Sequence, residues 1–287
     1  MIDKVGVIGS GLMGSEIALV FALAGKEVKL SDNNPEALQR ALDSLGKVLA
    51  KGVQRGFYKP EETAVALARI KATALLGPLE DCDLVIEAVF ESESVKAQVY
   101  KNLGEICQPD CIITSNTSSI PISTLASYLG PSRRANFVGT HFFSPVSRMK
   151  LVEVIPGLDT AESTVEVVMD ACREVGKTPI RVKDVVGFAV NRILHAFIIE
   201  AVRLVEEGVA TPEDIDTACK LGLGHPIGPF ELLDATQNSL ALQVQSILRE
   251  AYGERFQPRP LLKQMVKAGY NGKRAGRGWY KYGKGAA

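Results

Sequence analysis

Several features that direct a protein to a particular compartment or partner are scarce in this 287-residue sequence. Its five cysteines are scattered and none has Cys-x-x-Cys spacing, which argues against a disulfide framework or a zinc site. Lysine plus arginine equals aspartate plus glutamate at 33 each, so no overall field attracts nucleic acid or an anionic membrane. No apolar run has membrane-spanning length, and residues 1–14 lack the pattern of a signal peptide. We therefore expect a cytoplasmic protein without nucleic acid, membrane or metal partners.

The first part of the chain alternates strand-like and helix-like segments. A β-branched run at 4–8 is followed by a glycine turn, a buried helix at 12–24 and a second strand at 28–30. Further strands are expected at 70–73, 84–89, 112–115 and 137–142, helices at 94–107 and 122–129, and a helical insertion near 35–68 built from helices at 35–52 and 60–68. This order predicts an α/β domain with a Rossmann-type, doubly wound, mostly parallel sheet.

Strand patterns stop after 151–155 and 178–182, and only helical patterns follow. The boundary therefore lies near 183–186, which predicts an NAD-binding domain at 1–185 and a smaller all-α domain at 186–287 for substrate binding and dimerisation. Helices are expected at 188–207, 212–221, 229–252 and 259–268, with a loop and a loose tail at 269–285. The first of these helices is apolar over more of its circumference than one domain face requires. We expect a homodimer through these C-terminal helices.

Residues 9–14 read Gly-Ser-Gly-Leu-Met-Gly and fit the Gly-x-Gly-x-x-Gly pattern between the first predicted strand and helix. The first glycine permits the tight turn, the second lets a pyrophosphate approach the backbone, and the third allows close helix packing. The N-terminus of the helix offers free N–H groups to the phosphates. The residues expected to bind the dinucleotide here are Gly9, Gly11, Leu12, Met13 and Gly14.

Asp32 indicates which dinucleotide is used. It lies eighteen residues beyond Gly14 at the end of the second predicted strand, where a carboxylate binds both adenosine ribose hydroxyls. A carboxylate repels a ribose 2′-phosphate, and Asn33 and Asn34 supply no arginine to neutralise one. NAD is therefore favoured over NADP. The same turn serves FAD, but the absence of a second glycine fingerprint speaks for nicotinamide.

The sequence has three histidines, of which His141 has the setting of a catalytic group. It ends a predicted strand on the edge where open α/β sheets place ligands, and Glu153 follows on another predicted strand. If these strands are neighbours, the carboxylate can hold one imidazole nitrogen while the other accepts a substrate proton. A structural role is expected for His195, within an apolar helical run, and for His225, in a glycine and proline loop.

Six segments together resemble the 3-hydroxyacyl-CoA dehydrogenase family, and most of all its free-standing 3-hydroxybutyryl-CoA members. They occur in the family's order and extend over nearly the whole chain: 85–91 (VIEAVFE), 115–119 (SNTSS), 141–145 (HFFSP), 149–153 (MKLVE), 187–192 (GFAVNR) and 228–234 (GPFELLD). The resemblance implies an NAD-dependent enzyme that interconverts (3S)-3-hydroxyacyl-CoA and 3-oxoacyl-CoA. It implies a short or medium acyl chain, such as 3-hydroxybutyryl.

The resemblance also implies roles for individual residues. His141 becomes the acid/base, Glu153 its orienting partner, and Ser118 and Asn191 the groups around the reacting oxygen. Near the cofactor it implies Glu91 and Lys96 at the nicotinamide ribose and Asn116 at the cofactor or substrate edge, and it suggests that Ser44 and Lys51 meet the CoA phosphates. Ser44 and Lys51 share a face of a predicted helix, for which a simply solvated surface is an equal alternative.

Two departures from the family pattern concern the substrate. Ser144 stands where the family usually has asparagine, although the multifunctional branch also has serine there. Residues 235–240 (ATQNSL) replace a Gly-Leu-Asp element. Two alternatives therefore stay open. One is a dehydrogenase of a non-CoA hydroxy substrate on the same scaffold, such as gulonate or carnitine. The other is a non-catalytic, crystallin-like relative, which the joint presence of His141, Glu153, Ser118 and Asn191 argues against.

Overall fold

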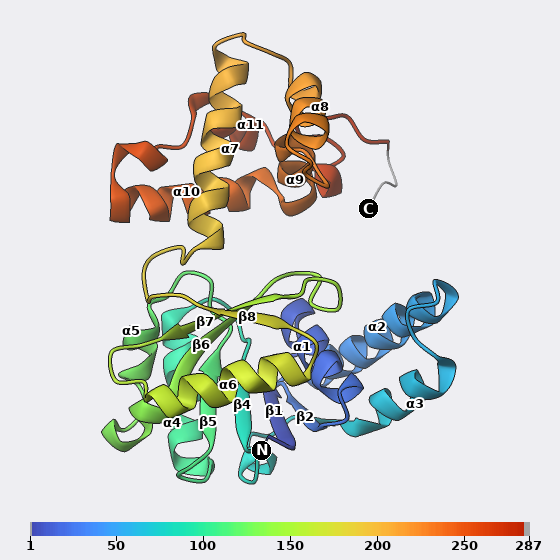
Figure 1. The fold of residues 1–287 in the computed structure, drawn as a ribbon, viewed down its shortest axis with the longest axis vertical. Helices are drawn as coiled ribbons and strands as arrows, with labels where there is room; N and C mark the ends of the chain where they lie inside the picture. Colours follow the sequence, from blue (N-terminus) through green and yellow to red (C-terminus); the bar gives the residue numbers. More distant parts are fainter. Residues whose placement is uncertain (1, 284–287) are drawn as a thin grey trace. The chain divides into compact units, whose positions relative to one another are not determined.

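The computed structural model describes residues 2–283, and the chain divides into two compact units (Figure 1). The first unit ends at Val185 and the second begins at Val186. Each unit has its own hydrophobic core, as is typical of a domain. Over the residues described, no helix combines the length and the apolar composition needed to cross a lipid bilayer.

One sheet of eight strands forms the centre of the first unit within the described residues. In spatial order the strands are β3 (Ile70–Thr73), β2 (Glu27–Ser31), β1 (Lys4–Ile8), β4 (Leu84–Glu87), β5 (Ile112–Ser115), β6 (Phe137–Phe142), β7 (Leu151–Pro156) and β8 (Thr178–Arg181). Neighbours are parallel except for β6 and β7, which are antiparallel. Strands β4 and β5 are buried at every residue, as expected for a sheet covered on both faces. The predicted Rossmann-type, mostly parallel sheet is confirmed.

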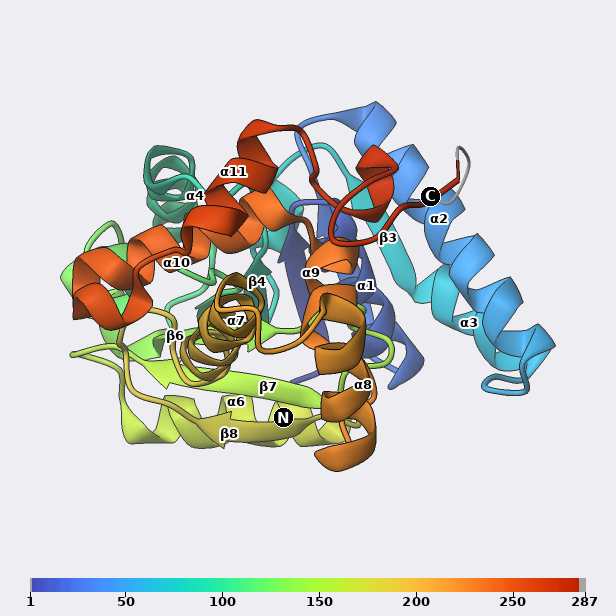
Figure 2. The same ribbon diagram turned by 90° about the horizontal axis from the view of Figure 1, so that it is seen from above.

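Helices cover both faces of this sheet. Figures 1 and 2 show α4 (Glu93–Ile106) and α6 (Glu162–Glu174) on opposite faces. Helix α1 (Leu12–Leu23) is buried without interruption from Gly14 to Ala22, because it packs on the sheet and is covered by the insertion. The insertion consists of α2 (Pro35–Gln54) and α3 (Pro60–Arg69), and the remaining helical elements of this unit are α5 (Ile122–Ala126) and the 3₁₀ turns η1 (Gly77–Leu79) and η2 (Pro131–Asn136).

Helix α6 is an element for which the sequence analysis made no prediction. It buries Val165, Val168 and Cys172 against the sheet, a spacing of three and four residues that suits one helix face. The helix is also needed by the topology, since β7 and β8 are parallel neighbours and parallel strands require a crossover connection. The predicted strands on either side of it therefore already implied a helix there.

Over residues 186–283 the named elements of the second unit are all helical, as expected. Its elements are α7 (Val190–Glu206), α8 (Pro212–Gly222), α9 (Pro229–Thr236), α10 (Asn238–Tyr252), η3 (Glu254–Phe256), α11 (Pro260–Lys267) and η4 (Lys273–Ala275). The prediction of one helix over 229–252 was wrong, because the chain breaks at Gln237, whose φ is 91°. The backbone N–H of Ser239 then donates to the Asn271 side chain at 2.7 Å, so a residue distant in sequence caps α10.

The expected loose tail is also wrong where it can be checked, since residues 270–282 are held against α9 and α10. The Asp234 carboxylate accepts hydrogen bonds from the backbone N–H groups of Trp279 and Tyr280, both at 2.9 Å, and from the Tyr282 hydroxyl at 3.0 Å. Gly278 permits this approach, because a Cβ there would lie 1.9 Å from an oxygen of Asp234. Residues 284 and 285 of that prediction lie outside the described residues.

Candidate active site

The glycine turn between β1 and α1 has the form that a dinucleotide pyrophosphate requires. Gly9 has φ of +97°, and a Cβ on it would lie 2.5 Å from the carbonyl oxygen of Ala88. A Cβ on Gly14 would lie 1.8 Å from the Gly9 oxygen, so helix and turn pack too closely for a side chain. Gly11 differs, since a Cβ there would meet nothing within 4 Å. The first and third glycines are thus explained by packing, and the second leaves open space at a helix N-terminus.

Asp32 closes one end of this turn. One of its oxygens accepts from the backbone N–H and the hydroxyl of Ser10, at 2.8 and 2.9 Å, and the other from the Asn34 N–H at 2.9 Å. An ionised carboxylate offers about four acceptor positions, so these bonds leave acceptor capacity for a ribose hydroxyl. The turn itself therefore orients this carboxylate.

A cleft of about 960 Å³ runs past the turn and Asp32. Its lining residues include those predicted for the phosphate turn except Gly14, which is buried in the packing of turn and helix. The lining also includes residues that follow β4 and residues of α4: Gly9, Gly11, Leu12, Met13, Asp32, Ala88, Val89, Phe90, Ser94, Val95, Gln98, Val99 and Asn102. Leu12 and Phe90 are 60% and 80% exposed, large apolar side chains that a ligand in the cleft would cover. Open backbone N–H groups, a carboxylate and apolar walls fit a dinucleotide.

His141 and Glu153 are in direct contact at the antiparallel β6–β7 pair. The two residues are opposite one another in the strand register, and Nδ1 of the histidine lies 2.8 Å from Oε2 of the glutamate. Glu153 is completely buried and His141 is 7% exposed. The sequence left open whether these strands are neighbours, and the structure brings the two side chains together as the catalytic hypothesis requires.

Glu91 orders the turn that carries Ser118. One oxygen of this carboxylate accepts from the hydroxyl of Thr117 at 2.6 Å, the backbone N–H of Ser118 at 2.9 Å and the N–H and hydroxyl of Ser119 at 3.1 and 2.9 Å. Burial by itself would raise the pKa of Glu91, but the Lys96 ammonium and these hydrogen bonds outweigh it and hold the pKa below its ordinary value. The carboxylate is thus kept ionised while it fixes the turn.

Lys96 and Asn116 make internal contacts. The Lys96 side chain is 1% exposed, and its ammonium lies 2.6 Å from Glu87 and 3.2 Å from Glu91. The Asn116 side chain accepts a hydrogen bond of 2.9 Å from the Phe142 N–H and so ties the loop after β5 to the end of β6. Lys96 therefore influences the site through Glu91, and Asn116 influences it through the end of β6.

Three buried charged residues around the site received no role from the sequence. Glu87 ends β4 with its carboxylate completely buried, and a charged residue closing an otherwise apolar strand was the available signal. Glu16 on α1 accepts from the Ser147 N–H at 3.1 Å. Lys177 donates to the carbonyl oxygens of Val146 and Met149, so these two groups fix the loop that follows His141. The partners of Glu16 and Lys177 are distant in sequence, which hides these two residues from local patterns.

Ser44 and Lys51 lie on the exposed face of α2. Lys51 lines a second hollow of about 790 Å³ in the first unit, whose other basic residues are Arg55, Arg148 and Lys150, whereas Ser44 is not part of that lining. The structure therefore places one of these two predicted residues at a concave basic surface.

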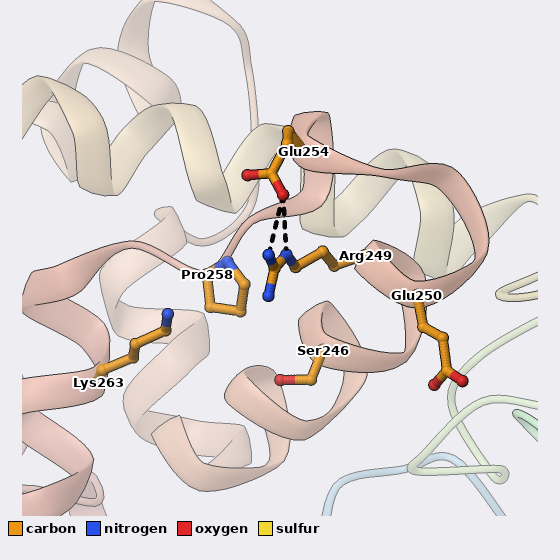
Figure 3. Close-up of a pocket in the computed structure, with 6 residues that line it drawn as sticks. All are labelled: Ser246, Arg249, Glu250, Glu254, Pro258 and Lys263. Atoms are coloured by element: carbon orange, nitrogen blue, oxygen red, sulfur yellow. Dashed lines mark hydrogen bonds and ion pairs between the residues drawn. The ribbon is translucent and has the colours of Figure 1, made fainter.

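Asn191 belongs to the second unit, in the first turn of α7. The same unit has a hollow of about 420 Å³, shown in Figure 3, between α10 and the chain leading to α11. Arg249 in this hollow is paired with Glu254 at 2.9 Å, so its charge already has a partner. Among residues 2–283, no cluster of three or more His, Cys, Asp or Glu side chains is arranged to hold a metal.

Comparisons with known proteins cover nearly the whole chain. A family model described as "3-hydroxyacyl-CoA dehydrogenase, NAD binding domain" matches residues 4–185, and one described as "3-hydroxyacyl-CoA dehydrogenase, C-terminal domain" matches residues 187–282. The chain is 43% identical to a "Probable 3-hydroxybutyryl-CoA dehydrogenase" of Deinococcus radiodurans, over 97% of this chain and 100% of the relative. It is 40% identical to the 3-hydroxybutyryl-CoA dehydrogenase of Bradyrhizobium diazoefficiens, over 98% and 96%.

A solved structure gives the same picture. The crystal structure of (S)-3-hydroxybutyryl-CoA dehydrogenase from Ralstonia eutropha superimposes with a TM-score of 0.94 at 39% sequence identity. The match covers 99% of this chain and 100% of that one. The similarity therefore includes both units and is not confined to the nucleotide-binding part.

Proposed function

The chain belongs to the 3-hydroxyacyl-CoA dehydrogenase family and, with NAD, interconverts 3-hydroxyacyl-CoA and 3-oxoacyl-CoA; we propose that His141 is its acid/base and Glu153 the partner of that histidine. The observation that carries this proposal is the 2.8 Å contact between their side chains, with a fully buried carboxylate, at the ligand-binding edge of the sheet. We further propose a (3S)-configured substrate with a short acyl chain, which the named relatives support.

In this mechanism the dyad handles the proton of the 3-hydroxyl group. Glu153 holds Nδ1, which fixes the imidazole tautomer and directs Nε2 to the substrate. During oxidation the neutral imidazole takes the hydroxyl proton at Nε2, and the adjacent carboxylate stabilises the imidazolium that forms. During reduction the imidazolium returns the proton to the oxygen. Bound NAD supplies the hydride acceptor for C3, and NADH the donor in reverse.

Residues of the first unit are proposed to hold the cofactor in place. The turn at Gly9, Gly11 and Gly14 receives the pyrophosphate, and Asp32 receives the adenosine ribose hydroxyls. Glu91 and Lys96 belong beside the nicotinamide ribose in this proposal. Asp32 also opposes a 2′-phosphate, which agrees with the use of NAD.

Ser118 and Asn191 are proposed to donate hydrogen bonds to the reacting oxygen. In this role they orient the 3-hydroxyl or 3-oxo group and stabilise the charge that develops on its oxygen. Ser118 suits the role because Glu91 fixes its backbone at 2.9 Å while its side chain stays at an exposed position of the turn. Asn191 would act from the first turn of α7.

The basic hollow beside α2 is the proposed position of the CoA phosphates. It combines the cations of Lys51, Arg55, Arg148 and Lys150 in a concave surface, and the chain as a whole carries no net charge to attract an anion. Ser44 would contribute from the same face of α2. The hollow supports Lys51 in this role better than the alternative of a solvated helix face.

A homodimer through the second unit is proposed on revised grounds. Much of the apolar surface of α7 is used internally, since Ile198 and Val202 belong to one core cluster and Ile199 to another. Among the described residues of this unit, the large apolar side chains that remain exposed are Ile193, Val209, Leu221, Leu223 and Leu240, at 71%, 64%, 84%, 64% and 49%. A sedimentation mass of one chain at micromolar concentration would contradict the dimer.

The reaction is tested by oxidation of NADH with acetoacetyl-CoA. We expect steady turnover with the thioester and a much lower kcat/KM with free acetoacetate, because the CoA phosphates contribute binding energy. Equal rates would instead favour a dehydrogenase of a non-CoA hydroxy substrate. No turnover with either compound, in a protein that still binds NADH, would favour a non-catalytic relative.

A further inference from the structure

The Glu87 carboxylate is a buried charge in the first unit that accepts four hydrogen bonds and that the mechanism does not yet use. One of its oxygens accepts from the Val89 N–H at 2.8 Å and the Lys96 ammonium at 2.6 Å, and the other from the Tyr100 hydroxyl at 2.5 Å and the Ser115 hydroxyl at 2.7 Å. Its side chain is completely buried. Four donors to one carboxylate compensate the loss of its hydration.

This carboxylate is connected to the proposed active site by a continuous series of contacts. Lys96, held by Glu87, lies 3.2 Å from the second oxygen of the Glu91 carboxylate. The first oxygen of Glu91 collects the four hydrogen bonds that order the turn at 117–119. Glu87 is therefore separated from the backbone of Ser118 by two intervening residues, Lys96 and Glu91.

A purely structural role does not account for this arrangement. Replacing a buried ion pair by apolar side chains is often neutral or stabilising, so stability alone gives little reason to bury Glu87 and Lys96. The two glutamates share one ammonium, and Glu87 makes the shorter contact with it. Without the charge of Glu87, the ammonium would have Glu91 as its one carboxylate partner and would draw that carboxylate toward itself, away from the position in which its other oxygen binds the turn.

We propose that Glu87 is a positioning residue of the dehydrogenase reaction, which through Lys96 holds Glu91 in the orientation that fixes the turn carrying Ser118. The inference rests on the proposed function of Ser118. It adds a residue that touches neither substrate nor cofactor and acts through two others.

Glu87→Gln separates charge from shape. Its amide oxygen can accept from Lys96 and Val89, and its NH₂ group can donate to the hydroxyls of Tyr100 and Ser115, both of which also accept. Tyr100→Phe is the matched control, because it removes a hydrogen bond to the same carboxylate and leaves the contact with Lys96. Both variants should lower the melting temperature.

Hydrogen exchange of residues 115–120 in the cofactor-free protein, and kcat with acetoacetyl-CoA and NADH, distinguish the two roles. We expect Glu87→Gln to accelerate exchange in this segment about tenfold more than Tyr100→Phe, and to lower kcat by up to about 100-fold through misplacement of the turn. If Glu87→Gln matched Tyr100→Phe in both measurements, the positioning role would be wrong. The exchange result needs no activity, so it still decides this point if the proposed reaction fails.

The double variant Glu87→Gln/Lys96→Met keeps the test valid if Glu87→Gln does not fold. It removes both buried charges together, so we expect a melting temperature close to that of the unmodified protein. Fast exchange at 115–120 and a low kcat should nevertheless persist, because Glu91 has lost its ammonium. Recovery of slow exchange and of kcat would show that the ion pair serves folding alone and would overturn the proposal.

Discussion

Each of the two units buries one histidine, and the two rings differ in whether Nδ1 has a hydrogen-bond partner. His141 in the first unit is 7% exposed and has the Glu153 carboxylate 2.8 Å from its Nδ1. His195 in the second unit is 6% exposed, and its Nδ1 has no hydrogen-bond partner among residues 2–283. Burial lowers the pKa of His195 to about 4, which keeps this ring neutral. Burial alone therefore does not mark a histidine as functional. The informative feature is the group that its ring nitrogen contacts.

Buried carboxylates differ between the units in the same way. Glu153 and Glu87 in the first unit contact an imidazole and an ammonium. Asp234 in the second unit is 1% exposed and accepts from two backbone N–H groups and a tyrosine hydroxyl. Glu153 is thus placed for proton transfer and Glu87 for positioning, whereas Asp234 holds the C-terminal segment in place. The four predictions that follow test this contrast.

The largest effect is expected for His141→Gln. A positioned acid or base contributes about 10²–10⁴-fold, so kcat should fall by that factor or more. NADH binding should stay nearly unchanged, because the cofactor's phosphates and ribose are held by the glycine turn and Asp32. Stopped-flow kinetics and fluorescence titration of NADH measure the two quantities. A loss in kcat of less than tenfold would remove His141 from the chemistry.

Asp32→Ala should change cofactor choice without changing the chemistry. Loss of even one charge-assisted hydrogen bond to the ribose, worth about 1.5–3 kcal/mol, should lower kcat/KM for NAD by roughly 10- to 150-fold or more. The preference for NAD over NADP should shrink mainly for this reason. Kinetics with both cofactors measure the ratio, and equal use of the two by the unmodified protein would refute the role of Asp32.

Asp234→Asn tests the structural member of the carboxylate contrast. The asparagine NH₂ group would face a backbone N–H of the 279–280 segment, leaving a buried donor unsatisfied at a cost of about 1–3 kcal/mol. We expect a lower free energy of unfolding in urea and an unchanged kcat per folded molecule. A loss of kcat with unchanged stability would place Asp234 among the functional groups.

The smallest effect concerns the acid sensitivity due to His195. Between pH 6.5 and about 4 the unfolded chain binds a proton that the folded His195 does not, so stability falls as the pH is lowered. By pH 5 this histidine should have cost about 2 kcal/mol, and below about pH 4 its contribution should change no further. His195→Leu should therefore flatten the urea stability profile between pH 7 and 5. An unchanged profile would contradict the neutral, unpartnered ring.

The sequence predicted the fold class, because the glycine turn, the β-branched strands and the loss of strand patterns after residue 182 are local signals. It missed the break at Gln237, because the cap of α10 comes from Asn271, more than thirty residues away. In the site it singled out the glycine turn by the spacing of its glycines, and His141 and Glu153 by their positions on predicted strands. It overlooked Glu16 and Lys177, since their partners meet them only in the folded chain. It also overlooked Glu87, although a charged residue at the end of an apolar strand was a signal for it.

The central claim is that Glu153 acts through His141, and a double-mutant cycle on kcat tests it most directly. The variants are His141→Gln, Glu153→Gln and the pair combined, assayed with acetoacetyl-CoA and NADH. Glu153→Gln keeps the shape of the side chain and removes the charge that stabilises the imidazolium, so it should lower kcat on its own. The double variant should then be no more than about threefold slower than His141→Gln, because groups that act as a unit are strongly non-additive. If the two losses multiplied, Glu153 would act independently of His141, and the proposed dyad would be wrong.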